Sequence, residues 1–111
     1  MDEQLGAAAG GWYLSLDDLS TGVSVMVFRI STAEAAAGFL VHEAHGGVAK
    51  GWTVTSYEMG DGANMATYVD GTLPTQYQMS IRKGRFLARI HGRSRDTVER
   101  FAQFVVAEMS E

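Results

Sequence analysis

Residues 77–90 read YQMSIRKGRFLARI, an alternation of apolar and polar side chains that is typical of a β-hairpin. With a two-residue turn at Lys83-Gly84, the apolar residues pair across the strands: Ile81 with Phe86, Met79 with Ala88 and Tyr77 with Ile90. Apart from the apolar Leu87, the opposite face is polar and carries Gln78, Ser80, Arg82, Arg85, Arg89 and His91. The hairpin therefore predicts a sheet that buries one of its faces.

Two helices are predicted outside this hairpin. Ser94 precedes a segment with apolar residues at helical spacing, and it is expected to cap the terminal helix. Ser31 and Glu34 form a capping box that begins an earlier helix, and Gly46-Gly47 is expected to end it.

Four further segments have strand character: 12–16, 23–30, 52–59 and 63–69. The element order is then β-β-α-β-β-β-β-α, without the alternation of strands and helices that parallel sheets require. We therefore expect an α+β fold, with a mainly antiparallel sheet of five to six strands and two helices packed on one face.

The stretch Val25–Phe28 is apolar at consecutive positions, so both faces of this strand should be covered. A central place in the sheet would achieve this, and so would an interface. Together with an outward Leu87, such a strand also suggests a homodimer.

The chain has 111 residues, enough for one domain, and its 46% hydrophobic and 20% charged residues are typical of a folded globular protein. Residues 1–11 are acidic and then rich in glycine and alanine, which predicts a flexible tail before a single domain at 12–111. The tail is either a linker behind a leader or anchor, which would place the domain outside the cytoplasm, or a native flexible terminus. Without a leader, the domain would be cytoplasmic.

The absence of cysteine excludes disulfide frameworks, thiolate zinc sites and cysteine nucleophiles. No apolar run approaches the roughly 18 residues that a membrane-spanning helix needs. Any chemistry would have to rest on histidines and carboxylates, which favours a role without catalysis.

The net charge of −4 hides a strong asymmetry. Residues 1–81 hold two basic and nine acidic side chains, a net −7, while residues 82–111 hold seven basic and four acidic ones, a net +3. A mildly acidic protein can thus carry one basic patch. The candidate residues are Arg82, Arg85, Arg89, Arg93 and Arg95.

Arginines on one hairpin face are suited to bind an anionic ligand or an acidic surface of a partner protein. The absence of interleaved aromatic side chains and the acidic chain both disfavour nucleic acid. We therefore expect a non-catalytic binding or interaction module that uses the arginine-bearing hairpin face.

The alternative is a metal site. His42 and His45 lie three residues apart near the predicted end of the first helix, and His91 lies on the last strand. If the three imidazoles converge, they could hold one zinc or copper ion, in a small metal-binding protein or a metal-dependent enzyme. The competing interpretation is that histidines in a last helical turn interact with the helix dipole.

Residues 77–90 with the capped helix after them resemble a recurring ending of small bacterial extracytoplasmic and lipoprotein domains. So does strand 23–30 followed by Ser31-Thr32-Ala33-Glu34-Ala35-Ala36. The layout of residues 23–109 is similar to that of PsbP/Mog1-like domains. Members of that family mostly act as accessory or binding modules, so the resemblance implies a binding role. It assigns no site residue, because no function-bearing motif matches.

Overall fold

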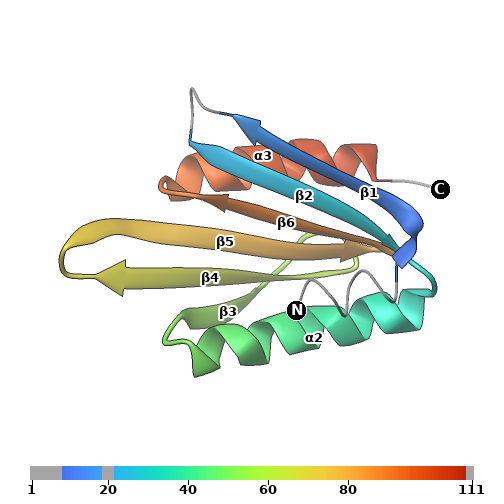
Figure 1. The fold of residues 1–111 in the computed structure, drawn as a ribbon, viewed down its shortest axis with the longest axis horizontal. Helices are drawn as coiled ribbons and strands as arrows, with labels where there is room; N and C mark the ends of the chain where they lie inside the picture. Colours follow the sequence, from blue (N-terminus) through green and yellow to red (C-terminus); the bar gives the residue numbers. More distant parts are fainter. Residues whose placement is uncertain (1–8, 19–21, 110–111) are drawn as a thin grey trace.

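The hairpin lies at the centre of a six-stranded antiparallel sheet with strand order β1-β2-β6-β5-β4-β3 (Figure 1). This computed structural model describes residues 9–18 and 22–109. The elements are β1 (Ala9–Asp18), β2 (Val23–Ile30), α2 (Ala33–Ala49), β3 (Thr53–Tyr57), β4 (Gly62–Asp70), β5 (Leu73–Lys83), β6 (Phe86–Gly92) and α3 (Arg95–Glu108). The predicted α+β class, antiparallel sheet and element order are confirmed.

The turn of the β5–β6 hairpin lies one residue later than predicted, at Gly84-Arg85. Met79 consequently pairs with Ile90 rather than with Ala88, a shift of two residues along the partner strand. Because side chains alternate between the two faces of a strand, an even shift leaves each residue on its predicted face. The predicted turn was therefore wrong, while the division into an apolar and a polar face was correct.

β2 lies between β1 and β6, in agreement with its apolar residues on both faces. Val25 and Val27 are buried in a core cluster with residues of α3. Phe28 and Ile30 are buried in a second cluster that includes residues of α2. These side chains are buried within the chain, and the homodimer stays a prediction.

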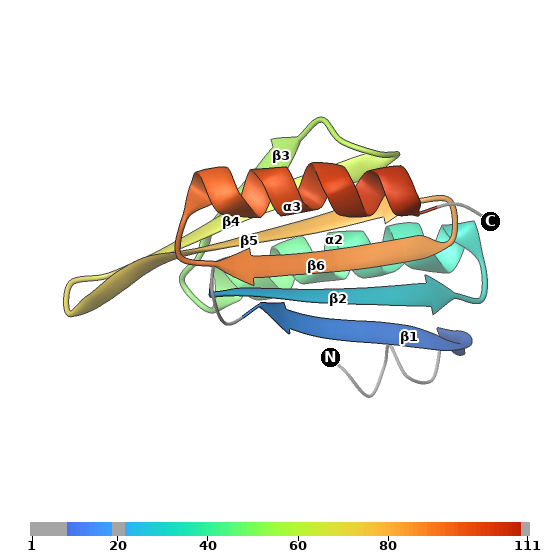
Figure 2. The same ribbon diagram turned by 90° about the horizontal axis from the view of Figure 1, so that it is seen from above.

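The two helices cover opposite faces of the sheet, and the expectation that both pack on one face was wrong. Figure 2 shows α3 in front of the sheet and α2 behind it. The physical reason is the second apolar strip, where Leu87 is buried beside Phe28, Ile30 and Ala36 of α2. Leu87, which departs from the polar pattern of its hairpin face, marks the place where α2 packs.

The helix caps agree in part with the sequence. Ser94 caps α3, and its hydroxyl accepts a hydrogen bond from the backbone N–H of Thr97 at 3.3 Å. Thr32, not Ser31, caps α2, because it is the Thr32 hydroxyl that accepts from Ala35 N–H at 3.0 Å. The helix also continues through Gly46-Gly47 to Ala49, one half-turn beyond its predicted end.

The first strand begins earlier than predicted, since β1 starts at Ala9 and takes up residues 9–11 of the expected tail. The rest of that tail, residues 1–8, lies outside the described residues. No helix in the described part of the chain is long and apolar enough to cross a membrane.

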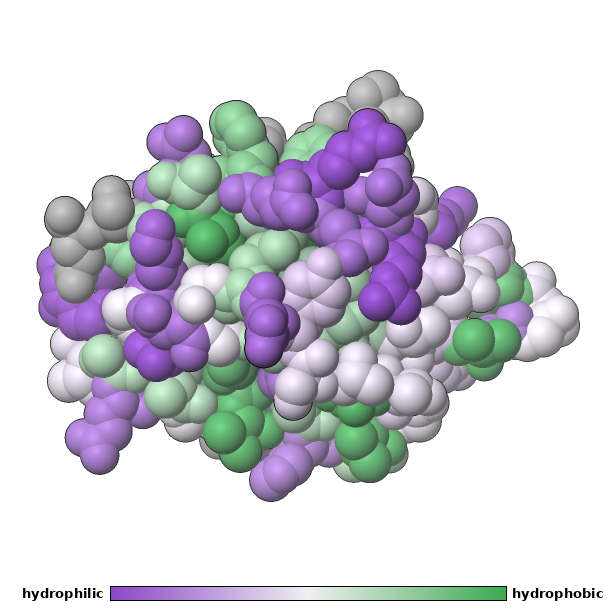
Figure 3. Space-filling model, turned by 180° about the vertical axis from the view of Figure 1, so that it is seen from behind, coloured by the Kyte–Doolittle hydropathy of each residue, from purple (hydrophilic) through white to green (hydrophobic). Residues whose placement is uncertain are grey.

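The end of β4 and the start of β5 form an arm that projects beyond the rest of the sheet (Figures 1 and 2). Val69 and Leu73 flank its turn, with 73% and 57% of their surface exposed. On the face seen in Figure 3, apolar colour is divided into small patches between hydrophilic ones, including one on this arm.

Candidate functional site

The polar face of the β5–β6 hairpin is not an outer surface, because the C-terminal half of α2 lies over it. Glu43 of α2 forms an ion pair with Arg89 of β6, and only 8% and 17% of the two side chains are exposed. The arginine that was expected to meet a partner is thus largely covered by the protein's own helix.

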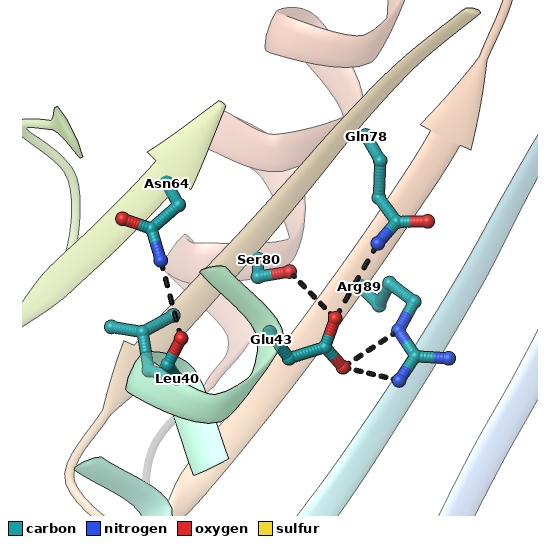
Figure 4. Close-up of polar contacts among 6 residues, drawn as sticks. All are labelled: Leu40, Glu43, Asn64, Gln78, Ser80 and Arg89. Atoms are coloured by element: carbon teal, nitrogen blue, oxygen red, sulfur yellow. Dashed lines mark hydrogen bonds and ion pairs between the residues drawn. The ribbon is translucent and has the colours of Figure 1, made fainter. Parts of the chain in front are cut away.

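The Glu43 carboxylate accepts hydrogen bonds from several side chains of the hairpin face (Figure 4). Arg89 donates to one carboxylate oxygen from Nε at 3.1 Å and also from Nη2. Gln78 Nε2 and Ser80 Oγ donate to the other oxygen, each at 3.5 Å. Three side chains of the sheet therefore converge on one carboxylate.

The strand register explains this convergence. Ser80 pairs directly with Arg89 across the hairpin, and Gln78 lies two residues earlier on the same face of β5. One strand further, Asn64 of β4 donates from Nδ2 to the backbone carbonyl of Leu40 at 3.3 Å. The donors stand on a hydrogen-bonded sheet, while the groups that accept from them belong to α2.

A cavity of about 450 Å³ lies between this half of α2 and the sheet. Its polar lining is supplied by His42, Glu43, Lys50, Asn64, Gln78, Ser80 and Arg89. Its apolar lining is supplied by Ala44, Trp52, Val54 and Ala66, and Gly46 and Gly47 complete the wall. The cavity is thus both charged and partly apolar, a combination suited to an amphipathic small molecule.

Trp52 of the cavity lining lies against two further rings. The Trp52 ring centroid lies 5.3 Å from that of Tyr68 and 6.3 Å from that of His91. His91 Nε2 is 2.9 Å from Gln76 Oε1, which fits a neutral imidazole that donates from Nε2. Burial first, and the charge of Arg93 second, hold the pKa of His91 below its ordinary value.

The other four predicted arginines do not line the cavity with Arg89. Arg82 donates from Nη1 to the Gly84 carbonyl at 3.1 Å, and Arg85 donates to the Ser31 carbonyl at 3.4 Å. Arg93 is exposed after β6, and Arg95 pairs with Glu99 one helical turn away at 3.5 Å. The five arginines are therefore distributed over several surfaces, and of these five the cavity contains Arg89.

The three histidines differ in exposure and in the groups that they contact. His42 and His45 are exposed on α2, and His42 lies on the cavity rim, while His91 is partly buried against Gln76. Within residues 9–18 and 22–109, no group of three or more histidine, cysteine or acidic side chains is placed to hold a metal ion.

Glu43 was not among the predicted site residues, although the sequence contains a signal for it. Glu43 lies seven residues after the buried Ala36 and three after Leu40, which places it on the inward side of α2. A charged residue on the inward side of a helix requires a partner. The sequence pattern does not indicate Arg89 as the partner of Glu43, because it predicts that Arg89 lies on an outer face.

No family model, curated protein or solved structure matches the chain. The similarity to PsbP/Mog1-like domains therefore stays a prediction.

Proposed function

We propose that the protein is a non-catalytic binding module that holds a small polar or anionic molecule in the cavity between α2 and the β5–β6 hairpin. The observation that carries this proposal is the cavity of about 450 Å³ with an ion pair and several amide and hydroxyl groups in its lining. Ligand pockets typically enclose about 300–1,000 Å³. The proposal keeps the predicted hairpin face and replaces its expected position on the surface by an internal one.

The two halves of α2 differ in a way that supports this role. Near its N-terminus, Ala36 packs against Ile30 and Leu87, as in an ordinary helix–sheet interface. Beyond Leu40 the sheet presents polar side chains instead, and the space between the layers is incompletely filled. Polar groups and empty volume both reduce stability relative to a packed apolar interface. Their presence in one place favours a function that needs them.

A panel screened by thermal shift tests this proposal. The panel contains small carboxylates, phosphates, sulfonates, amino acids and neutral alcohols, and it is applied to the purified chain. We expect a saturable rise of the melting temperature with at least one compound, because a ligand that binds only the folded state stabilises it. Calorimetric titration then gives the stoichiometry.

Matched variants locate the binding. Ala66→Trp fills the cavity from β4 and should abolish the shift, whereas Ala107→Trp makes the same change at an exposed position of α3 and should preserve it. Absence of a shift throughout the panel, or an unchanged shift in Ala66→Trp, would reject the cavity as the binding site.

A further inference from the structure

The ion pair in the cavity joins a side chain of the central sheet to a side chain of the helix that covers it. The donors Gln78, Ser80 and Arg89 belong to central strands of the sheet, each hydrogen-bonded to neighbours on both sides. The acceptor Glu43 belongs to a helix in which Ala36 is the one buried residue. The backbone positions of these donors are therefore fixed by the sheet and not by Glu43.

The second half of α2 is only partly covered by the sheet. Val41 and Val48 are exposed, as are His42 and His45. The adjacent Gly46 and Gly47 have lower helix propensity than alanine. This part of the helix is therefore held mainly by the contacts of Glu43 with Arg89 and by the close approach of Gly47 to Val54.

Glu43 also satisfies its donors incompletely. Only Arg89 approaches it closely, whereas Gln78 Nε2 and Ser80 Oγ remain 3.5 Å away. Good hydrogen bonds of these kinds measure about 2.7–3.0 Å. A carboxylate that is not attached to the helix backbone could approach all three donors at once.

The remainder of the cavity indicates what such a carboxylate would be attached to. Trp52 and Val54 form an apolar wall with Ala44 and Ala66, on the same cavity that contains the ion pair. A ligand that fits both parts has an acidic head and an apolar body.

We propose that the ligand is a small monocarboxylate with an apolar body, and that its carboxylate replaces Glu43 on Arg89, Ser80 and Gln78. This inference rests on the proposed function, since it names the class of ligand for the same cavity. Glu43 is then an internal substitute that occupies the anion site while the cavity is empty, and the ligand's body lies against Trp52 and Val54.

Calorimetric titrations with phenylacetate and 2-phenylethanol test this assignment, because the two probes share an apolar body and differ in the carboxylate. In Glu43→Ala the competing carboxylate is gone, so phenylacetate should bind about tenfold more tightly than to the unmodified protein. The affinity for 2-phenylethanol should change by less than about twofold. Glu43→Gln keeps the side-chain shape and replaces Glu43→Ala if that variant folds poorly. It should likewise bind phenylacetate more tightly than the unmodified protein does, with little change for 2-phenylethanol.

The double variant Glu43→Ala/Arg89→Met is the control, since it removes both charges and leaves neither unpaired. It should lose the gain in phenylacetate affinity. If the gain persists there, or if phenylacetate binds the Glu43 variants no more tightly than the unmodified protein, the carboxylate assignment is wrong. If both probes bind equally and Ala66→Trp abolishes both, the cavity is a binding site for another class of ligand. If neither probe nor any panel compound binds, both proposals fail.

Discussion

The two faces of the sheet are built on different principles, although a helix covers each of them. Under α3, the sheet presents Met79, Ile81 and Ile90, all fully buried, and Val98 and Ala102 of the helix pack into them. Under α2, an apolar strip occupies one half of the contact and a polar cavity the other half. One face is closed mainly by apolar packing, whereas apolar packing closes the other only at one end.

This difference indicates a division of labour. A continuous apolar core contributes most of the folding free energy of a small domain. With that contribution concentrated on the α3 face, the α2 face can tolerate an unfilled cavity and a largely buried ion pair. Substitutions on the two faces test this difference in stability.

The largest effect is expected on the α3 face. Ile90→Ala should lower the free energy of unfolding by about 3–4 kcal/mol, because it removes buried methyl groups and leaves a cavity. Gln78→Ala, on the floor of the α2 cavity, should cost less than about 1 kcal/mol, since its hydrogen bond is long. Urea denaturation measures both. Similar losses for the two variants would show that the faces do not differ in the way described.

The ion pair should give the next largest effect. Arg89→Met leaves Glu43 covered without its main partner, at an expected cost of about 2–3 kcal/mol, reduced by the access of water through the cavity. Adding Glu43→Leu removes the unpaired charge and should recover most of the lost free energy of unfolding. A double-mutant cycle from denaturation data checks this, and additive losses would contradict the coupling.

The two glycines of α2 offer a matched pair. A Cβ on Gly46 would meet no atom within 4 Å, so Gly46→Ala should stabilise the protein by about 0.5–1 kcal/mol. A Cβ on Gly47 would lie 3.0 Å from a methyl group of Val54, and that crowding should offset the gain. Thermal melts compare the two variants, and an equal response would mean that Val54 does not restrain the helix here.

The smallest effect concerns pH. Because burial lowers the pKa of His91 from 6.5, the unfolded chain binds this proton at a higher pH than the folded chain does. The free energy of unfolding should therefore rise with pH between the lowered pKa and about 6.5, and this stability is lost on acidification. His91→Gln should flatten that rise, while His45→Gln, at an exposed position of α2, serves as the control. An unchanged slope in His91→Gln would contradict the prediction.

Much of the fold could be predicted because its signals are local. The alternation in residues 77–90 assigned the residues outside the turn to their correct faces, even though the turn was misplaced by one residue, so that Lys83 belongs to β5 and Arg85 to the turn. The apolar run at Val25–Phe28 correctly predicted a strand covered on both sides. The same run, read with Leu87, argued against placing both helices on one face, and that consequence was missed.

Residue spacing along the chain is enough to predict the element order, the antiparallel hairpin, the cap at Ser94 and the two chemical faces of β5 and β6. Packing of the helices on the sheet places α2 over the polar face and pairs Arg89 with Glu43, while Arg82, Arg85, Arg93 and Arg95 lie elsewhere. Such pairings join residues far apart in the chain: 46 positions separate Glu43 from Arg89. No local pattern encodes the contact between a helix and a strand that distant, so the site emerges only when the layers are assembled.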